Sequence, residues 1–255
     1  MSVDPKLVDD LLEMQRAYEE AKGLGGLARV AEPAARAMGR FVPEGLVKDG
    51  LARADDMAGR TAPAWLRRVD TDDFAACAAA ADRVQRQAVI GSAVSGVASG
   101  VTGAAGLTAD MAVSFAVAAR TIRLTAMAYG FGGDGAEDRV LRAHALDLAM
   151  QGTGAARRAK TNYIKALLNG AKVAPSVPVA GPVVEEVAVR AGRLLLQRYG
   201  GAAAARVVPL ASSAVGGVVN YRLQSAVAGA ADYTYRARWL AARKALPAPV
   251  LEDVE

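Results

Sequence analysis

An uncharged run of twenty-two residues, AVIGSAVSGVASGVTGAAGLTA at positions 88–109, sets the first constraint on the fold. A membrane-spanning helix needs about 20 predominantly apolar residues, so the run is long enough to cross a bilayer. Only six of its residues are Val, Ile or Leu, however, whereas ten are Gly, Ser or Thr. Because the large aliphatic residues supply the free energy of insertion, this composition disfavours a permanent span.

The glycines of this run predict close helix packing. Gly96 and Gly100 are four residues apart, and small residues at that spacing form a smooth face on which a second helix can lie. Further glycines within 100–106 favour a turn. We therefore predict a buried helical hairpin, in which one helix ends near Gly100, Thr108 caps the next, and Asp110 lies in its first turn. Reversible insertion into a membrane and a permanent span are the alternatives.

The rest of the chain predicts a single all-α domain. It has 255 residues, of which 53% are hydrophobic and 5% aromatic, and no long segment alternates apolar and polar residues as a strand would. We expect a bundle-like domain over 1–255 of eight to ten helices, centred on the glycine- and alanine-rich hairpin. Its first helix is capped by Asp4 and starts at Pro5. Other predicted segments are an N-terminal helical extension (1–66), helices at 70–100, 137–151, 157–169, 183–199 and 202–246 (interrupted at Pro209), a proline-rich connector (173–182) and a flexible tail (247–255).

The charge pattern limits the classes of partner. The net charge is +5, but the basic residues are spread along the whole chain. This spread fits either an ordinary solvated surface or attraction to an anionic membrane. Nucleic-acid binding would need basic residues clustered with stacking aromatics, which the sequence lacks. The N-terminus has no signal-peptide pattern, and with one cysteine, Cys77, no intramolecular disulfide can form, so we expect a cytoplasmic protein.

Two charges, Asp110 and Arg120, stand out in the long apolar region. On one helix they would lie about 15 Å apart, too far to pair with each other. Since buried charges need partners, each is expected to meet a group on another helix, and Asn220 is a candidate. These residues are interpreted either as a structural polar network or as a site for the headgroup of a ligand.

Catalytic motifs are weak throughout the chain. His144 has Asp147 three residues later, so the pair could orient a base. A partly exposed helix histidine with no catalytic role is the simpler interpretation. The single histidine excludes the HExxH zinc motif, no Cys/His cluster has metal-ligand spacing, and GFGGDG at 130–135 matches no nucleotide-binding pattern. No cofactor or metal is predicted.

Aromatic and basic residues share the last predicted helix. Tyr221, Tyr235 and Trp239 lie near one face, with arginines around them. This pattern is typical of a helix packed against a neighbour, with arginine stems covering the edge. The same pattern is also found at membrane interfaces, so contact of this helix with a membrane is the alternative interpretation.

The stretch GSAVSGVASGVTGAAGLTADMAVSFAVAARTIRLTAMAYGFG resembles the signature of the bacterial EcsC family. A glycine- and alanine-rich run precedes Asp110, Arg120 follows ten residues later, and Tyr129-Gly130 comes next. Residues TDDFAACAAAADRVQRQA resemble the entry helix of that family. VVPLASSAVGGVVNYRLQSAVAGAADYTYRARWL resembles its C-terminal element, with Pro209, Gly216, Gly217 and Asn220. The likeness covers roughly residues 70–243.

The resemblance implies little about activity. The family takes its name from a gene that accompanies an ABC-transporter operon, and it has no assigned catalytic residues, although some relatives carry protease labels. From the residues we expect a non-enzymatic helical protein that associates peripherally with the inner face of a membrane, or binds anionic lipid or an acyl chain. A scaffold for a membrane transporter and a hydrolase with an unrecognised site are the alternatives. The candidate site comprises Asp110, Arg120, Tyr129 and Asn220, and the oligomeric state stays open.

Overall fold

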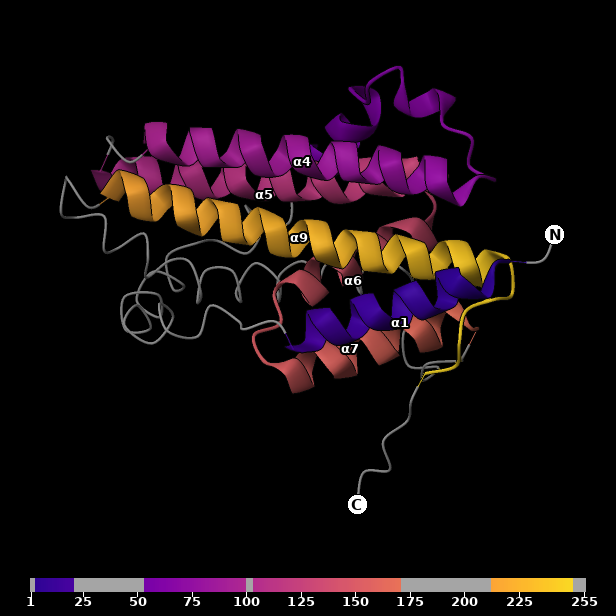
Figure 1. Ribbon diagram of the computed structural model, residues 1–255. Coiled ribbons are helices and arrows are strands. Elements are labelled where there is room, and N and C mark those ends of the chain that lie inside the picture. The colour runs from indigo at the N-terminus through magenta and orange to yellow at the C-terminus, as the bar shows by residue number, and fades with distance from the viewer. Residues whose placement is uncertain (1–2, 21–52, 100–102, 171–211, 250–255) are drawn as a thin grey trace.

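The computed structural model describes residues 3–20, 53–99, 103–170 and 212–249, and all regular structure in these ranges is helical (Figure 1). The elements are α1 (Pro5–Glu20), the short 3-10 helix η1 (Leu66–Arg68), α4 (Phe74–Ser99), α5 (Gly103–Ala128), α6 (Ala136–Ala149), α7 (Gly154–Leu168) and α9 (Ser212–Ala242). Residues 53–60 are helical as well. The all-α prediction is confirmed. The predicted connector 173–182, the helix 183–199 and Pro209 lie outside the described residues.

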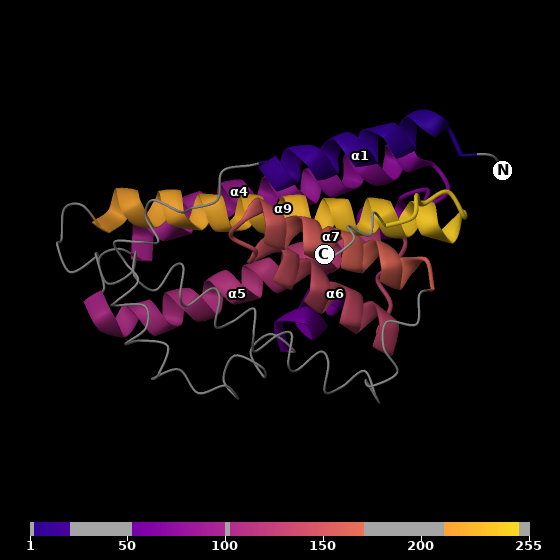
Figure 2. The same cartoon turned by 90° about the horizontal axis from the view of Figure 1, so that it is seen from below.

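Helices α4 and α5 form the predicted hairpin, and α9 packs against both of them (Figures 1 and 2). The second helix starts earlier than predicted, because α5 already begins at Gly103. Thr108 and Asp110 therefore lie inside the helix rather than at its cap and first turn. Alanine and leucine in 103–107 favour helix, which accounts for the added turn. Within the described part of the chain, no helix combines the length and apolar composition needed to cross a membrane.

Helix α9 is the centre of the fold. It contacts α1, α4, α5, α6 and α7. Between Val227 and Leu240 nearly every residue is buried, including Tyr233 and Tyr235. A helix that is buried on all sides needs neighbours on all sides, and here α4 and α5 cover one side while α1, α6 and α7 cover the others. The apolar core consequently follows the C-terminal half of α9.

Side-chain caps fix where several helices begin. Asp4 accepts a hydrogen bond from the Lys6 amide at 2.9 Å, so the predicted cap of α1 is confirmed. Asp73 accepts from the Ala75 amide at 2.8 Å and caps α4 in the same way. Helix α7 begins three residues before the predicted Arg157, because the Thr153 hydroxyl accepts from the Ala156 amide at 3.2 Å.

Left-handed residues follow three of the helices, and one of them is Gly170 after α7, with φ +73°. Gly130 has φ +86° after α5, and the Phe131 amide donates back to the Ala126 carbonyl at 2.8 Å. After α9, Lys244 takes φ +56°, and the Ala245 amide donates to the Leu240 carbonyl at 2.9 Å. This closing turn ends α9 at Ala242, four residues before the predicted end.

Candidate functional site

The predicted site residues in α5 and α9 have separate partners. Arg120 donates to the Thr61 hydroxyl at 2.6 Å and to the Thr61 carbonyl at 3.3 Å. These bonds join α5 to the segment that precedes η1. The backbone of Asp110 lies in α5, but its side chain is outside the described residues.

Tyr129 and Asn220 lie in two different polar contacts. The buried Tyr129 hydroxyl donates to Asp232 at 2.8 Å, and Asp232 also accepts from Arg236 at 2.9 Å. Burial, with the Asp232 charge beside it, raises the pKa of Tyr129, so the phenol stays protonated. Asn220 accepts from the Ser114 hydroxyl at 3.3 Å. These bonds give Arg120, Tyr129 and Asn220 three different partners and do not link them to one another.

His144 is buried, contrary to the prediction of a partly exposed histidine. It is 3% exposed because the whole stretch 141–149 of α6 is buried against its neighbours. The ammonium of Lys160 lies 2.9 Å from His144 Nδ1 and 2.5 Å from Asp147 Oδ2, and the Tyr163 ring packs on the imidazole. With lysine donating to Nδ1, the neutral imidazole carries its proton on Nε2, which is buried and has no hydrogen-bond partner.

This environment opposes a role for His144 as a base. Burial and the adjacent Lys160 charge lower the pKa of His144 to about 4, against the smaller raising effect of Asp147. Nδ1 faces the Lys160 ammonium and Nε2 has no hydrogen-bond partner, so neither ring nitrogen is hydrogen-bonded to a serine, threonine or cysteine in the described structure. Cys77 is buried in α4, where burial raises the pKa of its thiol to about 11. Among the described residues, no group of three or more His, Cys, Asp and Glu could hold a metal ion.

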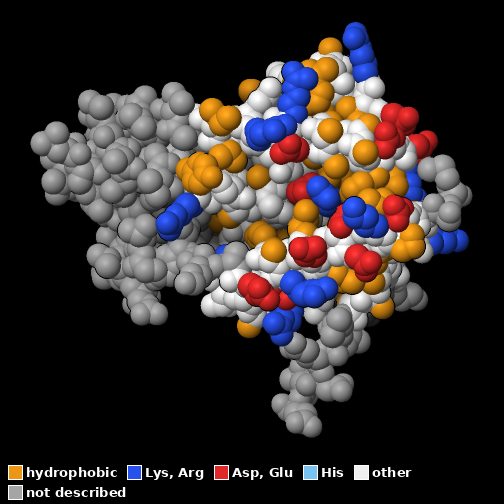
Figure 3. Space-filling model, viewed as in Figure 1, with side chains coloured by type: hydrophobic (Ala, Val, Ile, Leu, Met, Phe, Trp, Pro, Cys, Tyr) orange, Lys and Arg blue, Asp and Glu red, His pale blue; other side chains and the backbone are white. Residues whose placement is uncertain are grey.

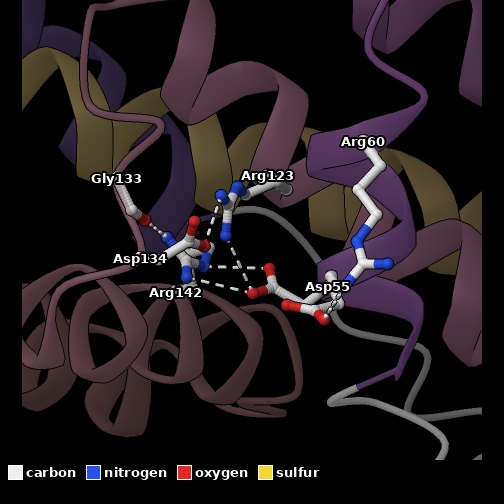
Figure 4. Close-up of polar contacts among 7 residues, drawn as sticks. Asp55, Arg60, Arg123, Gly133, Asp134 and Arg142 are labelled. Atoms are coloured by element: carbon white, nitrogen blue, oxygen red, sulfur yellow. Dashed lines mark hydrogen bonds and ion pairs between the residues drawn. The ribbon is translucent and has the colours of Figure 1, made fainter.

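Sequence reasoning missed the most extensive ionic network, which is centred on Asp55 (Figure 4). Arg142 binds both carboxylate oxygens of Asp55, at 2.9 and 3.0 Å, and Arg123 contacts the same carboxylate at 3.1 Å. Arg123 also pairs with Asp134 at 2.7 Å, and Arg142 donates to the Gly133 carbonyl at 2.9 Å. The two arginine side chains are only 4% and 5% exposed.

The network balances its own charges. Burial works to lower the pKa of Arg123, but Asp134 and Asp55 outweigh it and raise that pKa above the ordinary value. The hydrogen bond from Arg123 in turn lowers the pKa of Asp134. Two guanidiniums and two carboxylates leave no net charge for a ligand, so the network fastens the segment 53–60 to α5 and α6. In the sequence, the one signal for this network is Arg123, a charged residue within the apolar run TIRLTAMA.

The aromatic and basic residues of α9 divide into two groups. Tyr235 and Trp239 are buried, and arginine guanidiniums cover the neighbouring rings, with Arg238 over Phe131 and Arg243 over Trp239. The packing interpretation is therefore confirmed for this half of the helix. Tyr221 differs, because 52% of it is exposed.

One end of the α4–α5–α9 layer is almost free of charge. No residue from 87 to 99 in α4 or from 212 to 221 in α9 is charged, and Asp110 is the one charged residue from 103 to 119 in α5. Helices α4 and α5 pack against each other with three residues between them in the sequence, and the Ser114–Asn220 bond places α9 beside α5. We call this part of the molecule the uncharged end. Elsewhere charges are frequent, and Figure 3 shows both signs intermingled over the half that carries α1.

Large apolar side chains are exposed within the uncharged end. Ile90 on α4 is 65% exposed, and Val113 on α5 is 51% exposed. Tyr221 on α9 completes the group among the side chains that the structure describes. Met57, at 63%, is the other large hydrophobic residue of comparable exposure among the side chains described, which exclude 92–112 and 212–219, and it lies in the segment 53–60.

Comparison with known proteins places the chain in a family. No curated protein and no solved structure matches it. The EcsC protein family matches residues 15–240, a range that begins within α1 and ends within α9. Because this match spans most of the chain, the protein belongs to the EcsC protein family.

Proposed function

We propose that this protein associates peripherally with the inner face of a membrane through the uncharged end of the α4–α5–α9 layer. The observation that carries the proposal is the convergence, at one end of the molecule, of three helix segments that together hold a single charged residue, Asp110. A surface that meets only water gains nothing from excluding charge there, whereas a surface that enters lipid must exclude it. No catalytic role is proposed.

Exposed side chains support lipid contact at this end. Ile90, Val113 and Tyr221 leave large apolar surface in contact with water in the isolated protein. Transfer of one such side chain out of water contributes about 1.5 to 3 kcal/mol. The single carboxylate of Asp110 opposes deep insertion, which favours reversible association over a permanent span.

Basic residues next to the uncharged end favour anionic lipid. The first charged residue on α4 before the uncharged segment is Arg86, on α5 after it is Arg120, and on α9 after it is Arg222. All three are arginines, and the whole chain carries a net charge of +5. Each basic residue near an anionic surface contributes about 1 kcal/mol of attraction.

Vesicle flotation with a matched pair of variants tests this function. The wild-type protein is expected to float with vesicles made of equal parts phosphatidylcholine and phosphatidylglycerol, and to stay bound in high salt because apolar contacts resist screening. Ile90→Glu is expected to weaken binding about tenfold or more, since it replaces an apolar contact with a charge. Met57→Glu, at a site of similar exposure outside the uncharged end, is expected to bind like the wild type.

Two outcomes would redirect the proposal. If the protein stays in the soluble fraction with every vesicle and salt concentration, membrane association by this chain alone is wrong. If it floats only with vesicles that contain a membrane transporter, the uncharged end binds a protein partner, and the scaffold alternative takes its place.

A further inference from the structure

The guanidinium of Arg123 has one donor that the ionic network around Asp55 does not use. Its Nη1 donates to Asp55 at 3.1 Å and its Nη2 donates to Asp134 at 2.7 Å, whereas its Nε is buried and has no hydrogen-bond partner. A buried N–H without an acceptor costs free energy, and native proteins keep few such groups. The Nε–H of Arg123 is therefore available to a further acceptor.

Nε and Nη2 form one edge of the guanidinium, on which two N–H bonds point in nearly the same direction. Arginine uses such a pair of parallel donors to bind two oxygens of one carboxylate or phosphate. Asp134 uses only the Nη2 half of this edge, through its Oδ1 oxygen (Figure 4). The edge of Arg123 is thus half filled by a carboxylate of the protein itself.

Asp134 is the exposed member of the network. Its side chain is 67% exposed, against 22% for Asp55 and 4% for Arg123. An ion pair with an exposed partner contributes little stability, because water competes for the carboxylate. The backbone beside Asp134 is held in place, since the Gly133 carbonyl accepts from Arg142 at 2.9 Å. Rotation of one side chain into water is therefore enough to open the Arg123 edge.

The charges around this edge favour an anion. With Asp134 turned away, Arg123 and Arg142 share only the carboxylate of Asp55, so the network then carries one positive charge. The hydrogen bond from Arg123 lowers the pKa of Asp134 against the opposing effect of burial, and the charges of Arg142 and Arg139 lower it further. Three guanidiniums consequently stabilise negative charge at the position that Asp134 occupies.

We propose that the Nε–Nη2 edge of Arg123 binds the phosphate group of a phosphate monoester, and that Asp134 is an internal competitor which this phosphate displaces. A phosphate group has three oxygens that can accept from both donors at once, and it carries a charge of about −1.5 to −2 at pH 7. The same chemistry recognises a soluble monoester and the phosphate of a lipid headgroup. This inference does not rest on the membrane contact proposed for the uncharged end.

Calorimetric titration of the full chain with inorganic phosphate, at constant ionic strength, tests the proposal on a matched pair of variants. Asp134→Ala is expected to bind phosphate about tenfold more tightly than the wild type, because the competitor that keeps the edge closed is gone. Glu137→Ala removes the same charge three residues later, from an exposed position in the first turn of α6. Its affinity for phosphate is expected to stay within about twofold of the wild type.

The Nε–H resonance of Arg123 supplies a readout at the site itself. It is assigned through bonds from the Arg123 backbone in protein labelled with nitrogen-15 arginine. Addition of phosphate to Asp134→Ala is expected to shift this resonance and to slow the exchange of its proton with water, since the Nε–H then donates to the anion.

Flotation with vesicles that contain phosphatidic acid distinguishes the two sources of the phosphate. If the ligand is a lipid headgroup, Asp134→Ala floats at a lower lipid concentration than Glu137→Ala. If the ligand is a soluble monoester, the two variants float alike, and glycerol 3-phosphate reproduces the calorimetric gain of Asp134→Ala.

Two results would overturn the proposal. If Asp134→Ala binds phosphate no better than the wild type, or no better than Glu137→Ala, then Asp134 does not compete for an anion site. If phosphate binds and the Nε–H resonance of Arg123 does not move, the anion lies elsewhere on the protein.

Discussion

At the scale of single residues, His144 couples the stability of the fold to pH. Its pKa is about 4 in the folded protein, against 6.5 for an unperturbed histidine, because it is buried beside the Lys160 ammonium. Between these values the unfolded chain binds a proton that the folded protein does not. The contribution of neutral His144 is therefore complete above pH 6.5 and is lost as the pH falls toward 4.

We expect His144→Asn to reduce this acid sensitivity. Denaturant unfolding at pH 8 and pH 4.5 should show that the wild type loses about 2 to 3 kcal/mol more stability than the variant across this interval. His144 is the only histidine, and the acidic residues titrate in both proteins, so the difference isolates its effect. Equal losses in the two proteins would mean that His144 is accessible to protons in the folded state.

At the scale of elements, Asp55 holds the helical segment 53–60 against α5 and α6. Its carboxylate is the shared partner of Arg123 and Arg142, whose side chains are almost fully buried. We expect Asp55→Asn to lower the free energy of unfolding by about 3 kcal/mol, because removing one partner leaves buried charge without compensation.

The neighbouring Asp56 supplies the control for that variant. Asp56 pairs with Arg60 on the surface, where the two side chains are 59% and 81% exposed. Asp56→Asn is therefore expected to change stability by less than about 0.5 kcal/mol in the same denaturant titration. If both variants behave alike, the buried arginines have found water or other partners, and the segment 53–60 does not depend on Asp55.

At the scale of the whole molecule, α1 packs into the main body against α7 and α9. Leu11 of α1 is 1% exposed, and Glu19 accepts hydrogen bonds from Gln15 and Thr161. We expect Leu11→Ala to destabilise the protein by about 2 to 4 kcal/mol. If α1 unfolds together with the core, hydrogen exchange of the buried α9 amides should accelerate as well.

The exposed Glu13 of the same helix provides the comparison. Glu13→Ala should leave the exchange of the α9 amides unchanged. Loss of protection confined to α1 in Leu11→Ala would instead make α1 a separate N-terminal extension, as the sequence alone suggested for residues 1–66.

Local signals were the ones that the sequence could reveal. Asp4, which caps α1, and Gly130, which follows α5, act through their immediate neighbours, so a short stretch of sequence is enough to predict their roles. Arg142 and Asp55 are 87 positions apart in the sequence, and no local pattern around either residue predicts that the other is its partner. His144 was misjudged for the same reason, since the neighbours that bury α6 come from distant segments. The start of α5 was misplaced because helix-favouring residues extend it back to Gly103, and the end of α9 because the left-handed turn at Lys244 closes it early.

The central place of α9 has a consequence for synthesis of the protein. A ribosome makes every other described helix before it makes α9, yet α1, α4, α5, α6 and α7 all pack against that helix. These earlier helices leave the ribosome with the faces that will meet α9 still open to water. Most of the core can therefore assemble only after residue 240 has emerged, and until then the nascent chain exposes apolar surface of the kind that chaperones bind.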